Sequence, residues 1–208
     1  RRSGWEVLAE KLNGRFEVEV LTTTALGYDT WENYYPEGVE NIEGITVRRF
    51  RVDHPRDVES FNRLTDTLSL KTDRTPEEEN QWVEAQGPVC SGLLKYICDH
   101  EQTYDLFIFV TYLYYLTVRG LPRFADKAIL IPTAHDEPYI YFSVYRDVFL
   151  KPKGIIYLTE EEKDFVEKTF PNGHIPNIIA ATGVDIPEQV SELAFRKKYR
   201  VWDKYIIY

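Results

Sequence analysis

The sequence predicts an α/β domain, a Rossmann-like doubly wound fold whose parallel sheet is covered by helices on both faces. Short apolar runs typical of buried strands alternate along the 208 residues with segments whose apolar residues recur at helical spacing. Hydrophobic residues make up 43% and charged residues 28% of the chain, as in a globular domain with one sizeable core. Alternation of this kind favours parallel strands joined by helical crossovers.

The predicted strands are apolar, alternating or β-branched runs bounded by turn residues. In chain order they cover residues 16–21, 45–52, 105–110, 127–131, 154–158 and 175–180, with a further strand beginning at 205. The polar and aromatic segment 22–41 is predicted to be a loop.

The predicted helices have apolar residues on one side or begin with a capping residue. They cover residues 5–12, 55–70, 75–99, 112–121, 138–149, 159–170 and 188–199. Thr75 and Glu78 have the spacing of a capping box around Pro76, and the same helix is expected to bend near Gly87-Pro88. Thr159 is the expected cap of a later helix, with Glu162 as its partner in a second box.

Two parts of the parent protein are expected to lie outside this sequence. A doubly wound domain opens with a strand and a glycine-rich turn, whereas here a helix comes first. We therefore interpret residues 1–186 as a domain without its first strand and glycine-rich loop. Gly183 to Pro187 should leave the sheet, so residues 187–208 would be a linker helix and the start of a second domain.

Charge and cysteine content restrict the class of partner. The net charge of −9 argues against nucleic acid and against broad adsorption to an anionic membrane. No run is apolar and long enough to span a bilayer. Cys90 and Cys98 lack metal-ligand spacing and suit free thiols in a reducing compartment, so we expect a cytoplasmic protein, with peripheral membrane attachment left open. The acidic runs 77–79 and 160–162 are better explained as helix starts than as metal sites.

The segment 129–138, I-L-I-P-T-A-H-D-E-P, is the leading candidate for a functional site. An apolar strand there ends abruptly at His135, Asp136 and Glu137. Ligands of α/β proteins bind beyond the carboxyl ends of parallel strands, where this cluster would lie. The alternative is a solvated strand-to-helix turn in which Asp136 or Glu137 is the anion at the start of the next helix.

Several short motifs, taken in order, resemble the N-terminal domain of a family-4 glycosyltransferase with the two-domain GT-B fold. They are V-L-A-E-K-L, F-E-V-E-V-L-T-T, G-I-T-V-R-R-F, Y-D-L-F-I-F-V-T-Y, T-A-H-D-E-P, G-I-I-Y-L-T-E-E-E and I-P-N-I-I-A-A-T-G-V-D. The resemblance covers nearly the whole chain. It implies retaining transfer of a sugar from a nucleotide sugar, with no metal or other cofactor required, to a sugar, lipid-linked or small-molecule acceptor. It also implies that the C-terminal domain of the parent chain holds the nucleotide, and that this fragment is inactive alone.

The resemblance also assigns roles to individual residues. His135 would face the donor sugar near the reaction centre, since imidazole can exchange hydrogen bonds with hydroxyls and stabilise charge. The other residues would contact substrate: Asp136, Glu137, Thr111, Tyr112, Thr159, Glu160, Tyr28 and Trp31. Packing remains an alternative for the aromatic residues, and capping for Asp136 and Thr159.

Two other functions remain open. A carbohydrate-binding or scaffold domain would use the same edge without chemistry, and a nucleotide-sugar epimerase would alter the sugar without an acceptor. A dinucleotide oxidoreductase is disfavoured, because the sequence has no G-x-G-x-x-G motif between a strand and a helix.

Overall fold

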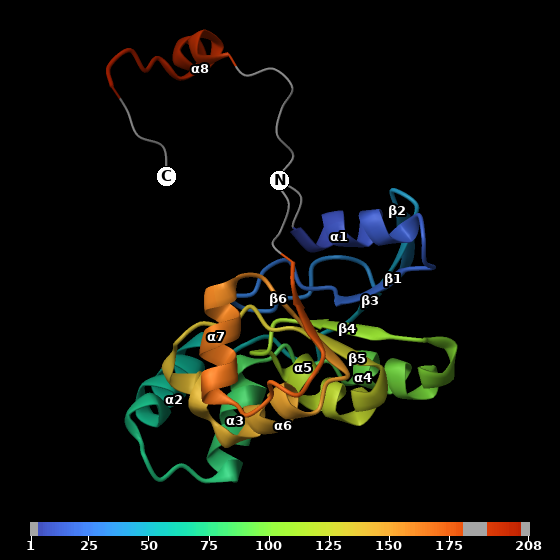
Figure 1. Ribbon diagram of the computed structural model, residues 1–208, viewed down its shortest axis with the longest axis vertical. Helices are drawn as coiled ribbons and strands as arrows, with labels where there is room; N and C mark the ends of the chain where they lie inside the picture. The colour runs from blue at the N-terminus through green and yellow to red at the C-terminus, as the bar shows by residue number, and fades with distance from the viewer. Residues whose placement is uncertain (1–3, 181–190, 205–208) are drawn as a thin grey trace.

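The computed structural model describes residues 4–180 and 191–204 and confirms an α/β architecture with parallel strands (Figure 1). Two sheets are present in this part of the chain. The first has the order β1-β3-β2, and the second has the order β4-β5-β6-β7. The strands are β1 (Glu19–Thr23), β2 (Gly38–Ile42), β3 (Ile45–Phe50), β4 (Phe107–Val110), β5 (Ala128–Ile131), β6 (Gly154–Tyr157) and β7 (Asn177–Ile179).

The helical elements follow the predicted order. The α-helices are α1 (Gly4–Asn13), α2 (Val58–Leu70), α3 (Pro76–Gln86), α4 (Ser91–Asp99), α5 (Tyr115–Gly120), α6 (Arg146–Leu150), α7 (Glu160–Thr169) and α8 (Glu192–Tyr199). Short 3-10 segments are η1 (Glu101–Thr103), η2 (Leu121–Lys127), η3 (Pro138–Tyr141) and η4 (Ser143–Tyr145). The expected exit from the sheet at 183–187 and the strand at 205–208 lie outside the described residues.

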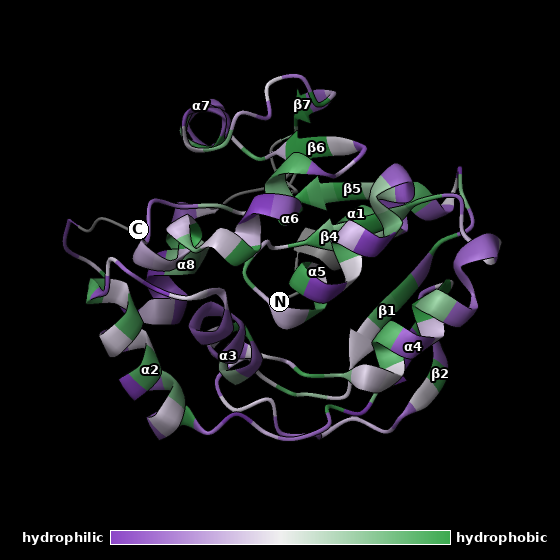
Figure 2. Ribbon diagram, turned by 90° about the horizontal axis from the view of Figure 1, so that it is seen from below, coloured by the Kyte–Doolittle hydropathy of each residue, from purple (hydrophilic) through white to green (hydrophobic). Residues whose placement is uncertain are grey.

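All four strands of the second sheet run parallel. Their inward side chains form the main core with α5, α6 and α7, and the fully buried members include Leu130, Tyr157 and Phe149. Figure 2 shows these strands side by side as largely hydrophobic ribbons. Because the strands are parallel, their carboxyl ends meet along one edge of the sheet, which is where the candidate site lies.

We predicted that helices cover both faces of the parallel sheet, but within the described residues one face stays partly exposed. Ile108 of β4 and Ile178 of β7 remain 43% and 59% exposed, and Ile129 and Ile156 between them are only partly buried. Paired register places Ile108 beside Ile129, and Ile156 beside Ile178, on the face opposite the main core. The helices that follow β4, β5 and β6 therefore cover one face only.

The prediction of a single parallel sheet is wrong in the first third of the chain. Strand β2 forms inside the segment expected to be a loop and pairs antiparallel with β3. The two residues between these strands, Glu43 and Gly44, both have positive φ, of 52° and 87°. Such a pair forms the tight turn that matches the twist of a hairpin. Every residue of β2 is exposed. A strand with no buried face does not need alternating apolar residues, and its sequence has no such alternation.

Local signals predicted correctly where α3 begins but not where it ends. The Thr75 capping box is present in full, because the Thr75 side chain accepts from Glu78 N–H and the Glu78 carboxylate accepts from Thr75 N–H. The segment 75–99 is two helices rather than one bent helix. Gly87 ends α3 with φ of 67°, and Pro88 has no N–H with which to continue the ladder.

The predicted helix over 138–149 is replaced by η3, η4 and the short α6. A carboxylate from another helix accepts a backbone N–H that a continuous helix would bond within itself. Glu79 of α3, only 4% exposed, accepts from the Ser143 hydroxyl and from Val144 N–H, the latter at 3.2 Å. Sequence periodicity within 138–149 cannot indicate a partner 65 residues away.

Candidate ligand-binding site at the carboxyl edge

The carboxyl ends of β4, β5 and β6 bring three polar segments together. These segments begin at Thr111, Pro132 and Leu158, directly after the three neighbouring strands. Thr111 N–H donates to Ile131 carbonyl at 2.8 Å, and Thr133 hydroxyl donates to Thr111 hydroxyl at 3.0 Å. The first two segments are therefore joined directly, at the position where α/β proteins bind ligands.

A hollow of about 370 Å³ lies between the segment after β5 and the start of α7. It is lined by Thr133, Ala134, His135, Asp136, Leu158, Thr159, Glu161, Glu162 and Phe165. Three predicted site residues, His135, Asp136 and Thr159, come together there. The other predicted residues lie outside its lining.

One buried carboxylate holds this hollow in shape. Glu162 is 8% exposed, and its two oxygens accept from Ala134 N–H and from Leu158 N–H, each at 2.6 Å. The expected second capping box is therefore only half formed. Thr159 does accept from Glu162 N–H at 3.0 Å, but the Glu162 carboxylate joins the segments after β5 and β6.

Two threonines at this edge have left-handed backbone conformations. Thr111 has φ of 69° and Thr133 has φ of 51°, which are uncommon for β-branched residues. Conformations of this kind are costly and concentrate at ligand sites, where surrounding contacts hold them. Thr111 carbonyl accepts from Thr117 hydroxyl at 2.8 Å, one of the contacts that fix this turn.

His135 and Asp136 present exposed side chains at the rim. Asp136 accepts from the Tyr141 hydroxyl at 2.8 Å and retains acceptor capacity for a ligand. Imidazole can both donate and accept, so the pair can bind a hydroxyl group from two directions.

Glu137 and Tyr112 lie behind the rim rather than in the hollow. The Tyr112 hydroxyl donates to the Glu137 carboxylate, and its ring is 1% exposed between Tyr145 and Phe149. Burial, followed by the Glu137 hydrogen bond and charge, raises the pKa of Tyr112 far above its usual range. The same causes raise the pKa of Tyr139 to about 12. The Tyr112 and Tyr139 hydroxyls therefore stay protonated at neutral pH and can donate to Glu137, in the segment after β5.

The remaining predicted residues are dispersed. Glu160 is exposed in the first turn of α7 but does not line the hollow. Tyr28 is 65% exposed in the loop after β1. Trp31, 8% exposed, packs edge-on against Tyr114 at 5.3 Å, and its indole N–H donates to Gln86 carbonyl at 2.7 Å. The structure thus gives Trp31 the contacts of a packing residue.

Glu161, Glu162 and Phe165 line the hollow but were not among the predicted site residues. The acidic run at 160–162 indicated only a helix start, although Glu161 and Glu162 project into the hollow region from that same turn. Hydrogen bonds from its own N–H and from the Thr159 hydroxyl hold the pKa of Glu161 below its usual range. Phe165, one helical turn beyond Glu161, adds an apolar surface.

The charge of the hollow restricts its ligand. Its lining has three acidic side chains and neither lysine nor arginine. Within the described ranges no group of three or more His, Cys, Asp and Glu side chains could hold a metal ion. The described helices also include none long and apolar enough to cross a membrane. Carboxylates without basic partners suit hydroxyl groups as hydrogen-bond donors and disfavour a bare phosphate.

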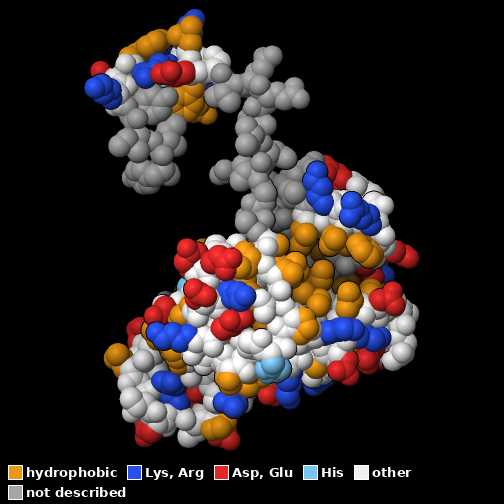
Figure 3. All heavy atoms as spheres, viewed as in Figure 1, with side chains coloured by type: hydrophobic (Ala, Val, Ile, Leu, Met, Phe, Trp, Pro, Cys, Tyr) orange, Lys and Arg blue, Asp and Glu red, His pale blue; other side chains and the backbone are white. Residues whose placement is uncertain are grey.

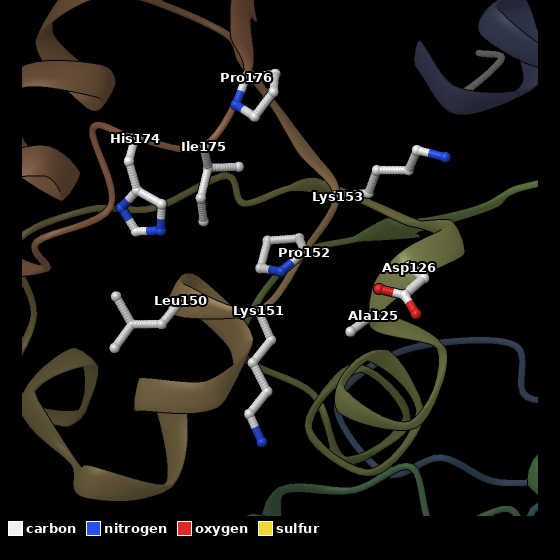
Figure 4. A pocket seen from close by; sticks show the side chains of 9 residues that line it. All are labelled: Ala125, Asp126, Leu150, Lys151, Pro152, Lys153, His174, Ile175 and Pro176. Atoms are coloured by element: carbon white, nitrogen blue, oxygen red, sulfur yellow. The ribbon is translucent and has the colours of Figure 1, made fainter.

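A second hollow, of about 460 Å³, lies at the opposite edge of the sheet and is lined in part by Lys151, Lys153 and His174 (Figure 4). Figure 4 shows the two lysine side chains extending away from each other. Because its polar groups diverge, this hollow lacks the converging contacts of a ligand site. His174 is an exposed histidine at the opposite edge of the sheet from His135, so it can serve as a control for His135.

No protein-family model matches the chain, and no curated protein or solved structure matches it at a significant level.

Proposed function

We propose that this chain is the acceptor-side domain of a retaining glycosyltransferase, and that its carboxyl-edge hollow binds a sugar. One observation carries the proposal. The hollow combines the exposed His135, Asp136, Thr159 and Glu161 with the ring of Phe165. Hydrogen-bonding side chains beside an aromatic surface match the two kinds of surface on a sugar, its hydroxyls and its C–H faces.

The order of motifs that resembles family-4 glycosyltransferases supports this proposal. His135 then lies beside the donor sugar, and Asp136 orients a hydroxyl. The absence of lysine and arginine from the lining suits a sugar rather than a diphosphate. The nucleotide and its leaving phosphate are accordingly assigned to a second domain of the parent protein. The acceptor hydroxyl attacks on the face from which the phosphate leaves, so the anomeric configuration is retained.

The first test is sugar binding by the 208-residue chain. The imidazole C–H signals of the four histidines are followed by NMR during titration with UDP-, GDP- and ADP-sugars and with free hexoses. We expect saturable shifts at His135 and none at His174, the exposed histidine at the opposite edge. His135→Ala should weaken binding by about 2- to 10-fold, the effect of one hydrogen bond. His174→Ala should leave affinity unchanged. Shifts at His174 alone, or none at saturating sugar, would refute the assignment of the site.

The second test separates catalysis from binding. Nucleotide release by the parent protein from one of these donors, lost in His135→Ala, supports transfer. Binding at His135 without release in the presence of acceptors favours a carbohydrate-binding domain. Change of the sugar without any acceptor favours an epimerase.

A further inference from the structure

Arg56, in the segment between β3 and α2, is a partly buried arginine without a carboxylate partner. In the described chain every other arginine that is not fully exposed forms an ion pair with a glutamate: Arg48, Arg49, Arg74, Arg119 and Arg196. Figure 3 shows lysine and arginine side chains interspersed with acidic ones over the face that it draws. No carboxylate of the described residues lies within ion-pair distance of Arg56, so no acidic side chain neutralises its charge.

Neutral groups hold the Arg56 side chain in place. Its Nε and Nη2 donate to the Gln86 carbonyl, Nε at 3.1 Å, and Nη2 also donates to the Gln86 side-chain oxygen at 3.1 Å. The guanidinium lies 5.2 Å from the ring centroid of Trp31 and 4.6 Å from that of Phe61. Gln86 is the last residue of α3, so the helix dipole offsets part of the charge. Burial still lowers the pKa of Arg56, as expected for a cation without an anion beside it.

Three hydrogen-bond donors in this group have spare capacity. Nη1 of Arg56 carries two hydrogens, and its one acceptor in the described chain is the Asp29 carbonyl at 3.4 Å. Burial raises the pKa of Tyr114, and the charges of Arg56 and Tyr28 also act on it, so the Tyr114 hydroxyl is neutral at pH 7 and near both. Neither tyrosine hydroxyl has a hydrogen-bond partner among the described residues. One fixed cation with neutral donors beside it is the composition of an oxyanion site.

The group lies at the edge of the sheets where ligands bind. Tyr28 follows β1, Arg56 follows β3 and Tyr114 follows β4. Trp31 packs edge-on against Tyr114 at 5.3 Å and joins the segments after β1 and β4. These three donors therefore come from beyond the carboxyl ends of three strands, the position of ligand sites in α/β proteins.

Glu137 connects this group with the sugar hollow. Its charge acts on Tyr114, and its carboxylate accepts from the Tyr112 hydroxyl. Asp136, the residue before it, lines the hollow. Glu137 and Asp29 are the carboxylates whose charges act on Tyr114 and Arg56 respectively, and neither forms an ion pair with Arg56.

We infer that Arg56, Tyr114 and Tyr28 bind an oxyanion, a carboxylate or a phosphate, carried by the sugar acceptor of the neighbouring hollow. The lining of the hollow has no lysine or arginine, so the sugar hydroxyls and the anion contact different residues. Binding of the oxyanion is independent of the proposed function, whereas its assignment to an acceptor rests on that function.

The test compares glucose, glucose 6-phosphate and glucuronate as ligands of the 208-residue chain, by NMR titration of the ¹⁵N-labelled protein at low ionic strength. We expect one anionic sugar to bind roughly 10- to 100-fold more tightly than glucose, the effect of a charged hydrogen bond. The tighter of the two identifies the anion as phosphate or carboxylate. Equal affinities for the three sugars would overturn the inference.

Three variants locate the effect. Arg56→Gln should remove the advantage of the anionic sugar, and Tyr114→Phe, which keeps the ring against Trp31, should reduce it by about 2- to 10-fold. Arg51→Gln, at an exposed arginine of the same segment, makes the same change in net charge and should leave it intact. Equal losses in the two arginine variants would show a general effect of charge and overturn the inference. Far-UV circular dichroism checks the fold, and if Arg56→Gln is unfolded, an undiminished advantage in Tyr114→Phe overturns the inference.

Inorganic phosphate and acetate separate this inference from the proposed function. A saturable shift of the Arg56 Nε–H signal with either ion, while no sugar affects His135, would support the oxyanion site and refute its assignment to a sugar acceptor. Shifts at His135 with glucose, while Arg56 responds to neither ion and to neither anionic sugar, would overturn the oxyanion site and leave the proposed function standing.

Discussion

Glu162→Gln tests whether one carboxylate holds the candidate site together. In the native chain the two Glu162 oxygens each accept a backbone N–H at 2.6 Å, from Ala134 and Leu158. Hydrogen bonds to a charged acceptor contribute about 1.5–3 kcal/mol each. Glutamine has nearly the same shape, but only one of its terminal groups accepts. One N–H would keep a weaker neutral bond, and the other would face the amide NH₂.

The free energy of unfolding should therefore fall by about 2–4 kcal/mol, the loss of one charged bond plus the weakening of the other. Glu160→Gln is the matched control, since it removes the same charge from the same first turn, and no hydrogen bond of the Glu160 side chain occurs among the described residues. It should cost only about 0.3–1 kcal/mol through the helix dipole.

Urea unfolding, followed by both tryptophan fluorescence and far-UV circular dichroism, measures the two free energies. Coincidence of the two signals checks that the transition is two-state. A difference below about 0.5 kcal/mol between the two variants would refute the reasoning, because the tertiary bonds would then add nothing to the loss of charge.

Three further outcomes are expected. Thr75→Ala should cost about 1 kcal/mol of unfolding free energy through loss of the capping box, while Thr72→Ala, at an exposed position just ahead of it, should change stability by less than about 0.5 kcal/mol in the same urea assay. With Ellman's reagent at pH 8, the exposed Cys98 should react fast and Cys90, whose pKa burial raises to about 11, only on unfolding; two equally fast thiols would contradict this. Burial raises the pKa of Tyr157 to about 12, so its contribution to stability is complete below about pH 10, the unfolded value, and is lost as pH rises through about 12. Phenolate absorbance at 295 nm should therefore rise later in the native chain than in urea, and superimposed titrations would count against it.

Features that depend on near neighbours were predictable. The Thr75 box joins residues three apart, and its geometry follows from the chain itself. The apolar runs 105–110, 127–131 and 154–158 became adjacent parallel strands, as short continuous apolar runs bounded by turn residues are typical of parallel sheets. The position of His135 at the end of β5 follows from the same reasoning.

Other features depend on partners distant in sequence. Trp31 was expected in a ligand loop, but its contacts include Gln86, 55 residues away, and Tyr114. Strand β2 has no buried residue and is specified by its pairing with β3. The segment predicted as a helix over 138–149 begins with 3-10 turns instead, and Glu79 accepts hydrogen bonds there from Ser143 and Val144.

The sequence by itself determined the α/β class, the order of the four parallel strands of the second sheet and the edge at which the candidate site lies, because apolar periodicity and capping act over a few residues. Only the tertiary structure decided that Glu162 joins two loops. The same holds, within the described residues, for the open edges of β1 and β4 and for the partly exposed face of the parallel sheet. These outcomes depend on contacts between segments that are far apart in the sequence, and no local pattern of residues encodes those contacts.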